Sequence, residues 1–156
     1  MKKYYLAYGS NLNIHQMMMR CPGAEIVGTT EIPGYELLFK GSLSGAYLTI
    51  EPKEGASVPA AVWATTAADE AALDRYEGCP SFYYKAAAVL PVKRLTSGET
   101  ESLEVYVYIM HEERKIGIPS RAYVMTCLEG YDDFGFEPEV LVEAVKRSRR
   151  LYHEGK

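Results

Sequence analysis

Residues that build disulfide or metal frameworks are scarce in this chain. It has three cysteines and three histidines among 156 residues. The cysteines are odd in number and show no Cys-x-x-Cys spacing, which argues against a disulfide framework and a zinc site. The histidines lie far apart, without His-x-His or His-Glu-x-x-His spacing. We therefore expect no metal site, and the free thiols fit a reducing compartment.

Long hydrophobic runs and excess positive charge are also missing. No segment approaches the roughly 20 apolar residues of a membrane-spanning helix, and the apolar run over 4–7 is too short for a secretory signal. The net charge is −4, so no broad basic field is available for a polyanion. One cationic run, Lys146-Arg147-Ser148-Arg149-Arg150, is better explained as the solvated last turn of a helix. We expect a cytoplasmic protein that binds neither membranes nor nucleic acids.

Length and composition indicate one globular domain over residues 1–156. Hydrophobic residues make up 47% and charged residues 24% of the chain, which is ordinary for a folded domain and too apolar for disorder. A chain of this length can bury a substantial core. No internal repeat, low-complexity tract or linker interrupts it.

Strand patterns fill the first two-thirds of the chain, and helical patterns fill the last third. Predicted strands cover 4–7, 25–32, 35–40, 46–51, 58–64, 82–93 and 102–110, with a polar loop over 52–57. Predicted helices run from Asn13 to about 21, from Thr66 to about Tyr76, from Ser120 to about Glu129 and from Glu137 to about Tyr152. Strands and helices do not alternate, which disfavours a doubly wound parallel sheet. We expect an α+β fold: a small, mainly antiparallel, mixed β-barrel with peripheral helices.

A glycine turn between the first strand and the first helix is one candidate site. Its sequence is Tyr8-Gly9-Ser10-Asn11-Leu12. Glycine permits positive φ and close backbone approach, and consecutive N–H groups can converge on a carboxylate or an oxyanion. The helix that follows adds partial positive charge. The alternative is that Gly-Ser-Asn simply forms a stable turn, with Asn11 bonding its own backbone. On the residues alone this alternative is the more common.

Glu77, at the predicted end of the second helix, is a candidate general base. A carboxylate in the last helical turn faces the negative end of the helix dipole, and Glu77 shares a helix face with Leu73. Dipole and burial would both raise its pKa toward neutrality. The alternative, more common on the residues alone, is a solvated glutamate paired with a lysine or arginine.

Tyrosine is over-represented, with thirteen tyrosines against four phenylalanines. Phenols can orient a polar ligand without adding charge, although most buried tyrosines are core residues with a hydrogen-bonded hydroxyl. Those expected at a sheet interior or its mouth are Tyr83, Tyr84, Tyr106, Tyr108 and Tyr123. Nucleotide and serine-hydrolase motifs are absent, and Cys79 has no evident histidine partner, which favours a buried thiol over a nucleophile.

Together these residues resemble the γ-glutamylcyclotransferase-like family, including its bacterial members. The likeness runs in order along nearly the whole chain. It is carried by the Tyr8–Leu12 turn, Leu73-Asp74-Arg75-Tyr76-Glu77-Gly78 and Pro119-Ser120-Arg121-Ala122-Tyr123, with Arg20-Cys21-Pro22-Gly23-Ala24 and Ile32-Pro33-Gly34-Tyr35 similar to bacterial members.

The resemblance implies a small β-barrel with a crevice where the Gly9 turn meets Glu77. It implies a cofactor-independent enzyme that cyclises a small γ-glutamyl amide and releases 5-oxoproline and a free amine or amino acid. By motif, Glu77 would transfer the proton. The substrate-binding residues would be Tyr8, Gly9, Ser10, Asn11, Leu12, Tyr83 and Tyr123.

The leaving group stays open between amino acids and amines. Specificity is expected to depend on residues 111–118 and 130–136, and the protein is expected to be a monomer or a homodimer. Two other functions are compatible with the chain. One is a non-catalytic domain of the same fold that binds a small carboxylate or amide, although the intact glutamate argues against it. The other is nucleic-acid binding through the run over 146–150.

Overall fold

The computed structural model of the chain describes residues 2–42 and 45–155. Strand-forming segments come first and two helices come last, as the sequence predicted. The elements in chain order are β1 (Lys3–Ala7), the 3-10 turn η1 (Ser10–Leu12), α1 (Ile14–Arg20), β2 (Glu25–Ser42), β3 (Gly45–Thr65), α2 (Ala67–Glu77), β4 (Tyr83–Arg94), β5 (Thr100–Met110), β6 (Lys115–Ile116), α3 (Arg121–Phe134) and α4 (Pro138–His153).

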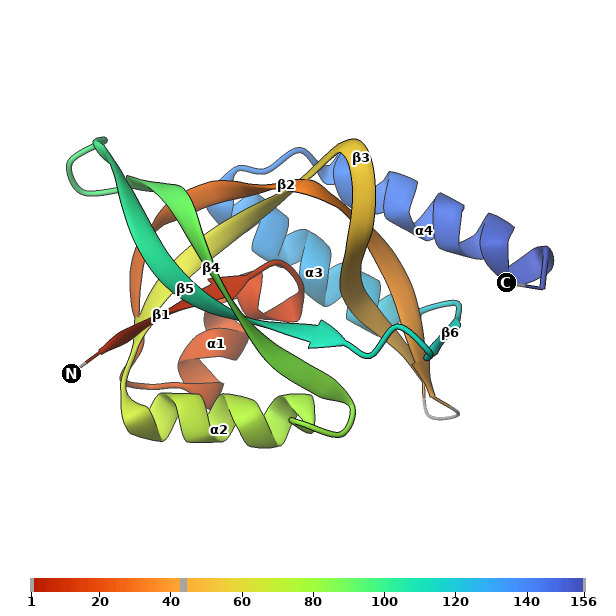
Figure 1. Cartoon of the computed structure of the whole chain (residues 1–156), viewed down its shortest axis with the longest axis horizontal. Helices are drawn as coiled ribbons and strands as arrows, with labels where there is room; N and C mark the ends of the chain where they lie inside the picture. Colours follow the sequence, from red (N-terminus) through yellow and green to blue (C-terminus); the bar gives the residue numbers. More distant parts are fainter. Residues whose placement is uncertain (1, 43–44, 156) are drawn as a thin grey trace.

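Five strands close into a small barrel, which confirms the predicted fold class. The strand order is β3-β1-β5-β4-β2, and pairing of β2 with β3 closes the circle, while β6 pairs with the C-terminal end of β2 at Lys40 and Gly41. Strands β1 and β5 run parallel, whereas the other pairs are antiparallel. Figure 1 shows α2 along one side of the barrel, and α3 and α4 on the side of β2 and β3.

Strands β2 and β3 are longer than the sequence predicted. Predicted strands 25–32 and 35–40 merge into β2, and 46–51 and 58–64 merge into β3. The expected loop over 52–57 is wrong, because β3 continues through it. The register nevertheless jumps from the pair Pro33–Ser57 to the pair Tyr35–Pro52. Residues 53–56 therefore have no partner on β2, and the polar segment forms a large bulge rather than a break in the strand.

Local capping chemistry places helix α2 where the sequence predicted it. Thr66 accepts a hydrogen bond from the Asp69 N–H, and the Asp69 side chain accepts one from the Thr66 N–H, forming a capping box. Gly78 ends the helix with a φ of +63°, a conformation in which glycine avoids the steric cost of a side chain. Glu77 is thus the last helical residue.

Helix α3 passes the predicted end at Glu129 and continues to Phe134. The interior glycine, Gly130, does not end it, although glycine costs a helix about 1 kcal/mol relative to alanine. A Cβ on Gly130 would lie 2.5 Å from the Asn13 nitrogen, so α3 packs directly on the backbone after η1. This close approach offsets the low helix propensity.

The barrel interior and the faces beneath the helices form one continuous core. Its largest fully buried side chains include Trp63, Tyr131, Phe39, Leu6 and Leu12. Within residues 2–42 and 45–155, none of the helices is both long and apolar enough to cross a membrane.

Candidate active site

One cavity opens where the barrel mouth meets the end of α2. Its volume is about 330 Å³, and its walls come from β1, the turn after β1, β3, β4, β5, α3 and the end of α2. The residues that line it are Tyr5, Tyr8, Gly9, Ser10, Asn11, Tyr47, Leu48, Tyr76, Glu77, Phe82, Tyr83, Tyr108 and Tyr123. Glu77 is the one residue in this set with a formal charge at neutral pH. The cavity is therefore an aromatic, hydroxyl-rich chamber around a single carboxyl group.

The Glu77 carboxyl is enclosed without a partner. No hydrogen bond or ion pair to it occurs within the described ranges. Burial raises its pKa from the ordinary value of 4.5 to about 7, and the positive charge of Arg20 opposes this rise. The direction agrees with the sequence-based expectation, with burial as the main cause. A carboxyl group with this pKa can take up and release a proton near neutral pH.

The charge on Glu77 affects the pKa of four buried phenols. After burial, which is the larger effect on each hydroxyl, the Glu77 carboxylate further raises the pKa of Tyr5, Tyr8, Tyr83 and Tyr123. These phenols therefore stay protonated at neutral pH and add no charge. The Tyr5 hydroxyl, which accepts from the Asn11 amide, keeps a proton that it can donate to a ligand beside Glu77. Tyr8 and Tyr83 already donate to the carbonyls of Tyr108 and Leu48.

The turn after β1 offers backbone donors to the same cavity. The Leu12 N–H donates to the Gly9 carbonyl and the Asn13 N–H to the Ser10 carbonyl, both at 3.0 Å, which closes the short η1 turn. Among the residues that the structure describes, the N–H groups of Ser10 and Asn11 have no acceptor. Free N–H groups at the start of such a turn suit a carboxylate or an oxyanion. Gly9 does not use the positive φ that glycine permits, because its φ is −124°.

The side chains of this turn are held by neighbours. The Ser10 hydroxyl lies 3.1 Å from the Tyr76 hydroxyl. The Asn11 amide donates to the Tyr5 hydroxyl at 2.9 Å and accepts from the Arg20 guanidinium, so it does not form the local backbone bond considered above. Leu12 is fully buried and lies outside the cavity wall. The structure thus brings Tyr8 to Asn11 to the cavity but not Leu12.

Tyr83 and Tyr123 both bind the peptide groups of Leu48, beside the Gly9 turn: a Cβ on Gly9 would lie 3.5 Å from the Tyr123 hydroxyl. The Tyr83 hydroxyl donates to the Leu48 carbonyl at 2.7 Å, and the Tyr123 hydroxyl accepts from the Leu48 N–H at 3.1 Å. Two other tyrosines of the predicted set, Tyr84 and Tyr106, lie outside the cavity wall. The two hydroxyls therefore fix the barrel wall as well as facing the chamber.

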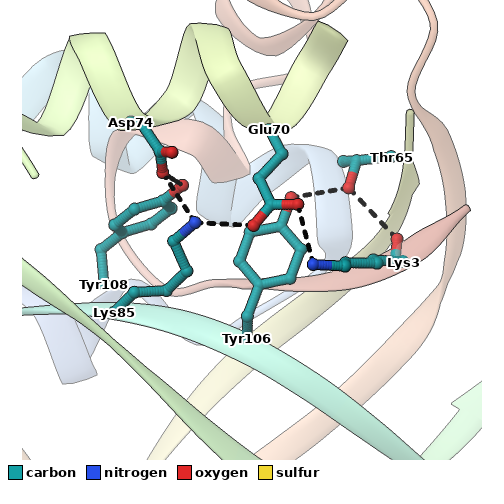
Figure 2. Close-up of polar contacts among 7 residues, drawn as sticks. All are labelled: Lys3, Thr65, Glu70, Asp74, Lys85, Tyr106 and Tyr108. Carbon is teal, nitrogen blue, oxygen red and sulfur yellow. Dashed lines mark hydrogen bonds and ion pairs between the residues drawn. The ribbon is translucent and has the colours of Figure 1, made fainter. Parts of the chain in front are cut away.

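A polar cluster attaches α2 to the barrel (Figure 2). The Lys85 ammonium on β4 lies 2.6 Å from the Glu70 carboxylate and 2.9 Å from that of Asp74. The Tyr108 hydroxyl donates to Asp74 at 2.6 Å, and Lys3 pairs with Glu70 at 3.3 Å. Two residues of α2, one turn apart, are thereby tied to β1, β4 and β5, which anchors the helix that carries Glu77.

Sequence reasoning missed several cavity residues. Tyr5, Tyr47 and Phe82 reach the cavity because distant strands close the barrel, and no local pattern indicates this. Tyr76 carried a signal, since it directly precedes Glu77. None of the lining residues comes from 111–118 or 130–136, the segments expected to determine specificity.

Comparisons with known proteins identify the fold. Among solved structures, the fold is similar to a protein named gamma-glutamyl cyclotransferase, with a TM-score of 0.76 and 22% identity over 92% of this chain and 86% of that chain. A human protein described as uncharacterised has a TM-score of 0.71 and 23% identity, over 92% of this chain and 86% of that chain. A yeast protein titled as a gamma-glutamyl cyclotransferase specific to glutathione has a TM-score of 0.56 and 12% identity, over 96% of this chain and 100% of that chain. At these identities the likeness establishes the fold.

No curated protein matches the sequence. The family model described as "Gamma-glutamyl cyclotransferase, AIG2-like" matches residues 5–125, a span that contains both the Gly9 turn and Glu77. The chain therefore belongs to the gamma-glutamyl cyclotransferase, AIG2-like family.

Proposed function

We propose that this protein is a γ-glutamyl cyclotransferase, which converts a γ-glutamyl amide into 5-oxoproline and a free amine or amino acid. One observation carries the proposal: the Gly9 turn and Glu77, far apart in sequence, line the same cavity. Membership of the family and the fold of its solved relatives support it.

Glu77 is the proposed proton carrier. The nucleophile is the α-amino group of the substrate, which is protonated at neutral pH and must lose a proton before it attacks. A carboxyl group with a pKa of about 7 can accept that proton at neutral pH. The amine then attacks the γ-carbonyl carbon, and a new C–N bond forms.

The Gly9 turn is the proposed anion holder. Attack converts the γ-carbonyl into a tetrahedral oxyanion, and the substrate also carries an α-carboxylate. The N–H groups of Ser10 and Asn11 would bind one of these two anions. When the intermediate collapses, the original amide C–N bond breaks and Glu77 returns its proton to the leaving nitrogen. The ring nitrogen also loses its second proton, which the released amine takes up to leave as an ammonium ion. Atoms and charge then balance without an external reagent.

Most of the acceleration would come from holding the substrate folded. Ring closure is intramolecular, so a chamber that keeps the amine near the carbonyl supplies a large part of the rate. A protein nucleophile is not required. Cys79 lies outside the cavity wall, and burial together with nearby Asp74 raises the pKa of its thiol, so the unreactive thiol form is favoured.

The test is a panel of γ-glutamyl amino acids and γ-glutamyl amines, with 5-oxoproline as the measured product. Glu77→Gln should lower kcat/KM on an active substrate by about 10²–10⁴-fold. Glu129→Gln, an exposed position on α3, is the matched control and should keep wild-type activity. Tight binding of the panel without any 5-oxoproline would refute the proposal and indicate a binding domain. Full turnover by Glu77→Gln would refute the role of Glu77.

A further inference from the structure

Arg20, the last residue of α1, connects the two halves of the cavity rim. Its guanidinium donates to the Asn11 side-chain oxygen in the Gly9 turn. The same group lies over the ring of Tyr76, with Cζ 3.4 Å from the ring centroid. Tyr76 directly precedes Glu77 on α2 and also contacts the Ser10 hydroxyl. Arg20 therefore touches the anion-holding turn on one side and the helix of the proton carrier on the other.

The guanidinium group suits this position better than an ammonium would. It is planar, so it can stack on an aromatic ring while its edge donates hydrogen bonds. Across residues 2–42 and 45–155, no carboxylate lies within ion-pair distance of Arg20. Its charge is thus not cancelled locally and remains available to act on the nearby carboxyl of Glu77.

The other groups that face Glu77 supply no competing charge. They are the phenols of Tyr5, Tyr8, Tyr47, Tyr76, Tyr83, Tyr108 and Tyr123 on β1, its following turn, β3, α2, β4, β5 and α3. Cys79 is held as the neutral thiol by a raised pKa. Lys85 is paired with Glu70 and Asp74 in the cluster of Figure 2. Within the described residues, Arg20 is the one charge that opposes the effect of burial on Glu77.

We propose that Arg20 is a positioning residue that clasps the Gly9 turn to α2 and keeps Glu77 able to ionise at neutral pH. Its contribution to turnover rests on the cyclotransferase function proposed above, whereas its effect on Glu77 ionisation does not. Loss of the charge should raise the pKa of Glu77, so a larger fraction of the base is blocked by a proton at pH 7. Loss of the planar clasp should loosen the turn against α2 and weaken catalysis even when the charge is kept.

Two variants separate these effects. Arg20→Gln removes the charge and keeps an amide that can donate to Asn11. Arg20→Lys keeps the charge and removes the planar stack on Tyr76. Arg75→Met is the matched control, because Arg75 is exposed on the same helix as Glu77 and does not act on its pKa.

The first measurement is an NMR titration of ¹³C-labelled glutamate carboxyls, with Glu77 assigned by its loss in Glu77→Gln. We expect the Glu77 midpoint to move upward by at least about half a pH unit in Arg20→Gln, and to stay near wild type in Arg20→Lys and Arg75→Met. The second measurement is kcat/KM against pH. The acidic limb of this profile should move to higher pH in Arg20→Gln. In Arg20→Lys the limb should stay at its wild-type pH, but kcat should fall by about tenfold.

An unchanged Glu77 midpoint in Arg20→Gln would overturn the inference about charge. Wild-type kcat in Arg20→Lys would overturn the clasp. A shifted midpoint in a protein that makes no 5-oxoproline would support the electrostatic role of Arg20 and contradict only the proposed reaction.

Discussion

In two regions of the molecule, the pKa values of carboxylates on helix α2 shift in opposite directions. In the cluster of Figure 2, Glu70 and Asp74 of α2 face Lys85. Burial alone would raise the pKa of both, but hydrogen bonds from Lys85, and from Tyr108 to Asp74, outweigh it, so both values are lowered. In the cavity, Glu77 has burial without a partner, and its pKa rises to about 7. Partners, rather than residue type, separate the paired anions from the proposed proton carrier.

Sequence spacing does not distinguish these three acids. Positions 70, 74 and 77 are four and three residues apart, so they lie along one stripe of the helix. Lys85 comes from β4 and reaches the first two carboxylates, whereas Glu77 extends into the chamber at the barrel mouth. The barrel therefore determines which of the three carboxylates is paired and which lines the cavity. Changes on the two sides of this contrast should therefore have different effects on stability.

The largest effect concerns the stability cost of an unpaired acid. Between the ordinary pKa of 4.5 and the folded value of about 7, the folded state binds the Glu77 proton more tightly than the unfolded chain does. The free energy of unfolding should therefore fall as pH rises through this window, by about 2–3 kcal/mol between pH 5 and pH 8. Glu77→Gln should lack this component. Urea unfolding of both proteins at pH 5 and pH 8 measures it, and identical pH responses would contradict the unpaired state of Glu77.

A smaller loss of stability is expected where α3 packs closely on the backbone after the Gly9 turn. In Gly130→Ala, the new Cβ would lie 2.5 Å from the Asn13 nitrogen and 2.6 Å from the Leu12 carbonyl carbon. Backbone must move, so the gain in helix propensity should be outweighed and unfolding should become easier by about 1–3 kcal/mol. The Gly9 turn should shift as well, lowering kcat/KM. Glu129→Ala, at the neighbouring exposed position, is the control, and equal stability of both variants would show that α3 does not position the turn.

The smallest effect on stability is expected in the cluster where Asp74 pairs with Lys85. Asp74→Asn removes one charge from a half-buried ion pair but leaves an acceptor for Tyr108. We expect a loss of about 0.5–1 kcal/mol in the free energy of unfolding at pH 7. The Asp74 contribution should fade as pH falls through its lowered folded pKa. Glu143→Gln breaks an exposed pair with Lys146 at 3.7 Å and should change stability by less. A matching change in both variants would mean that the cluster does not anchor α2.

Local chemistry made part of this arrangement predictable. The Thr66–Asp69 capping box and Gly78 mark the two ends of α2 in the sequence itself, so the sequence alone places Glu77 at a helix end. The opening turn and Glu77 could be linked through family resemblance. Long-range pairing was not predictable, because β1 beside β5 joins Tyr5 to Tyr106 across the chain. The contact of Arg20 with Tyr76 and the paired state of Asp74 follow from that closure and have no local pattern.

The central claim, that the Gly9 turn and Glu77 act on one molecule, is most directly tested by a crystal structure with 5-oxoproline. We expect the lactam beside the Glu77 carboxyl, with one of its anionic or carbonyl oxygens accepting from the Ser10 and Asn11 N–H groups. A ligand bound at another surface, or a Glu77 side chain turned out of the cavity toward solvent, would contradict the account.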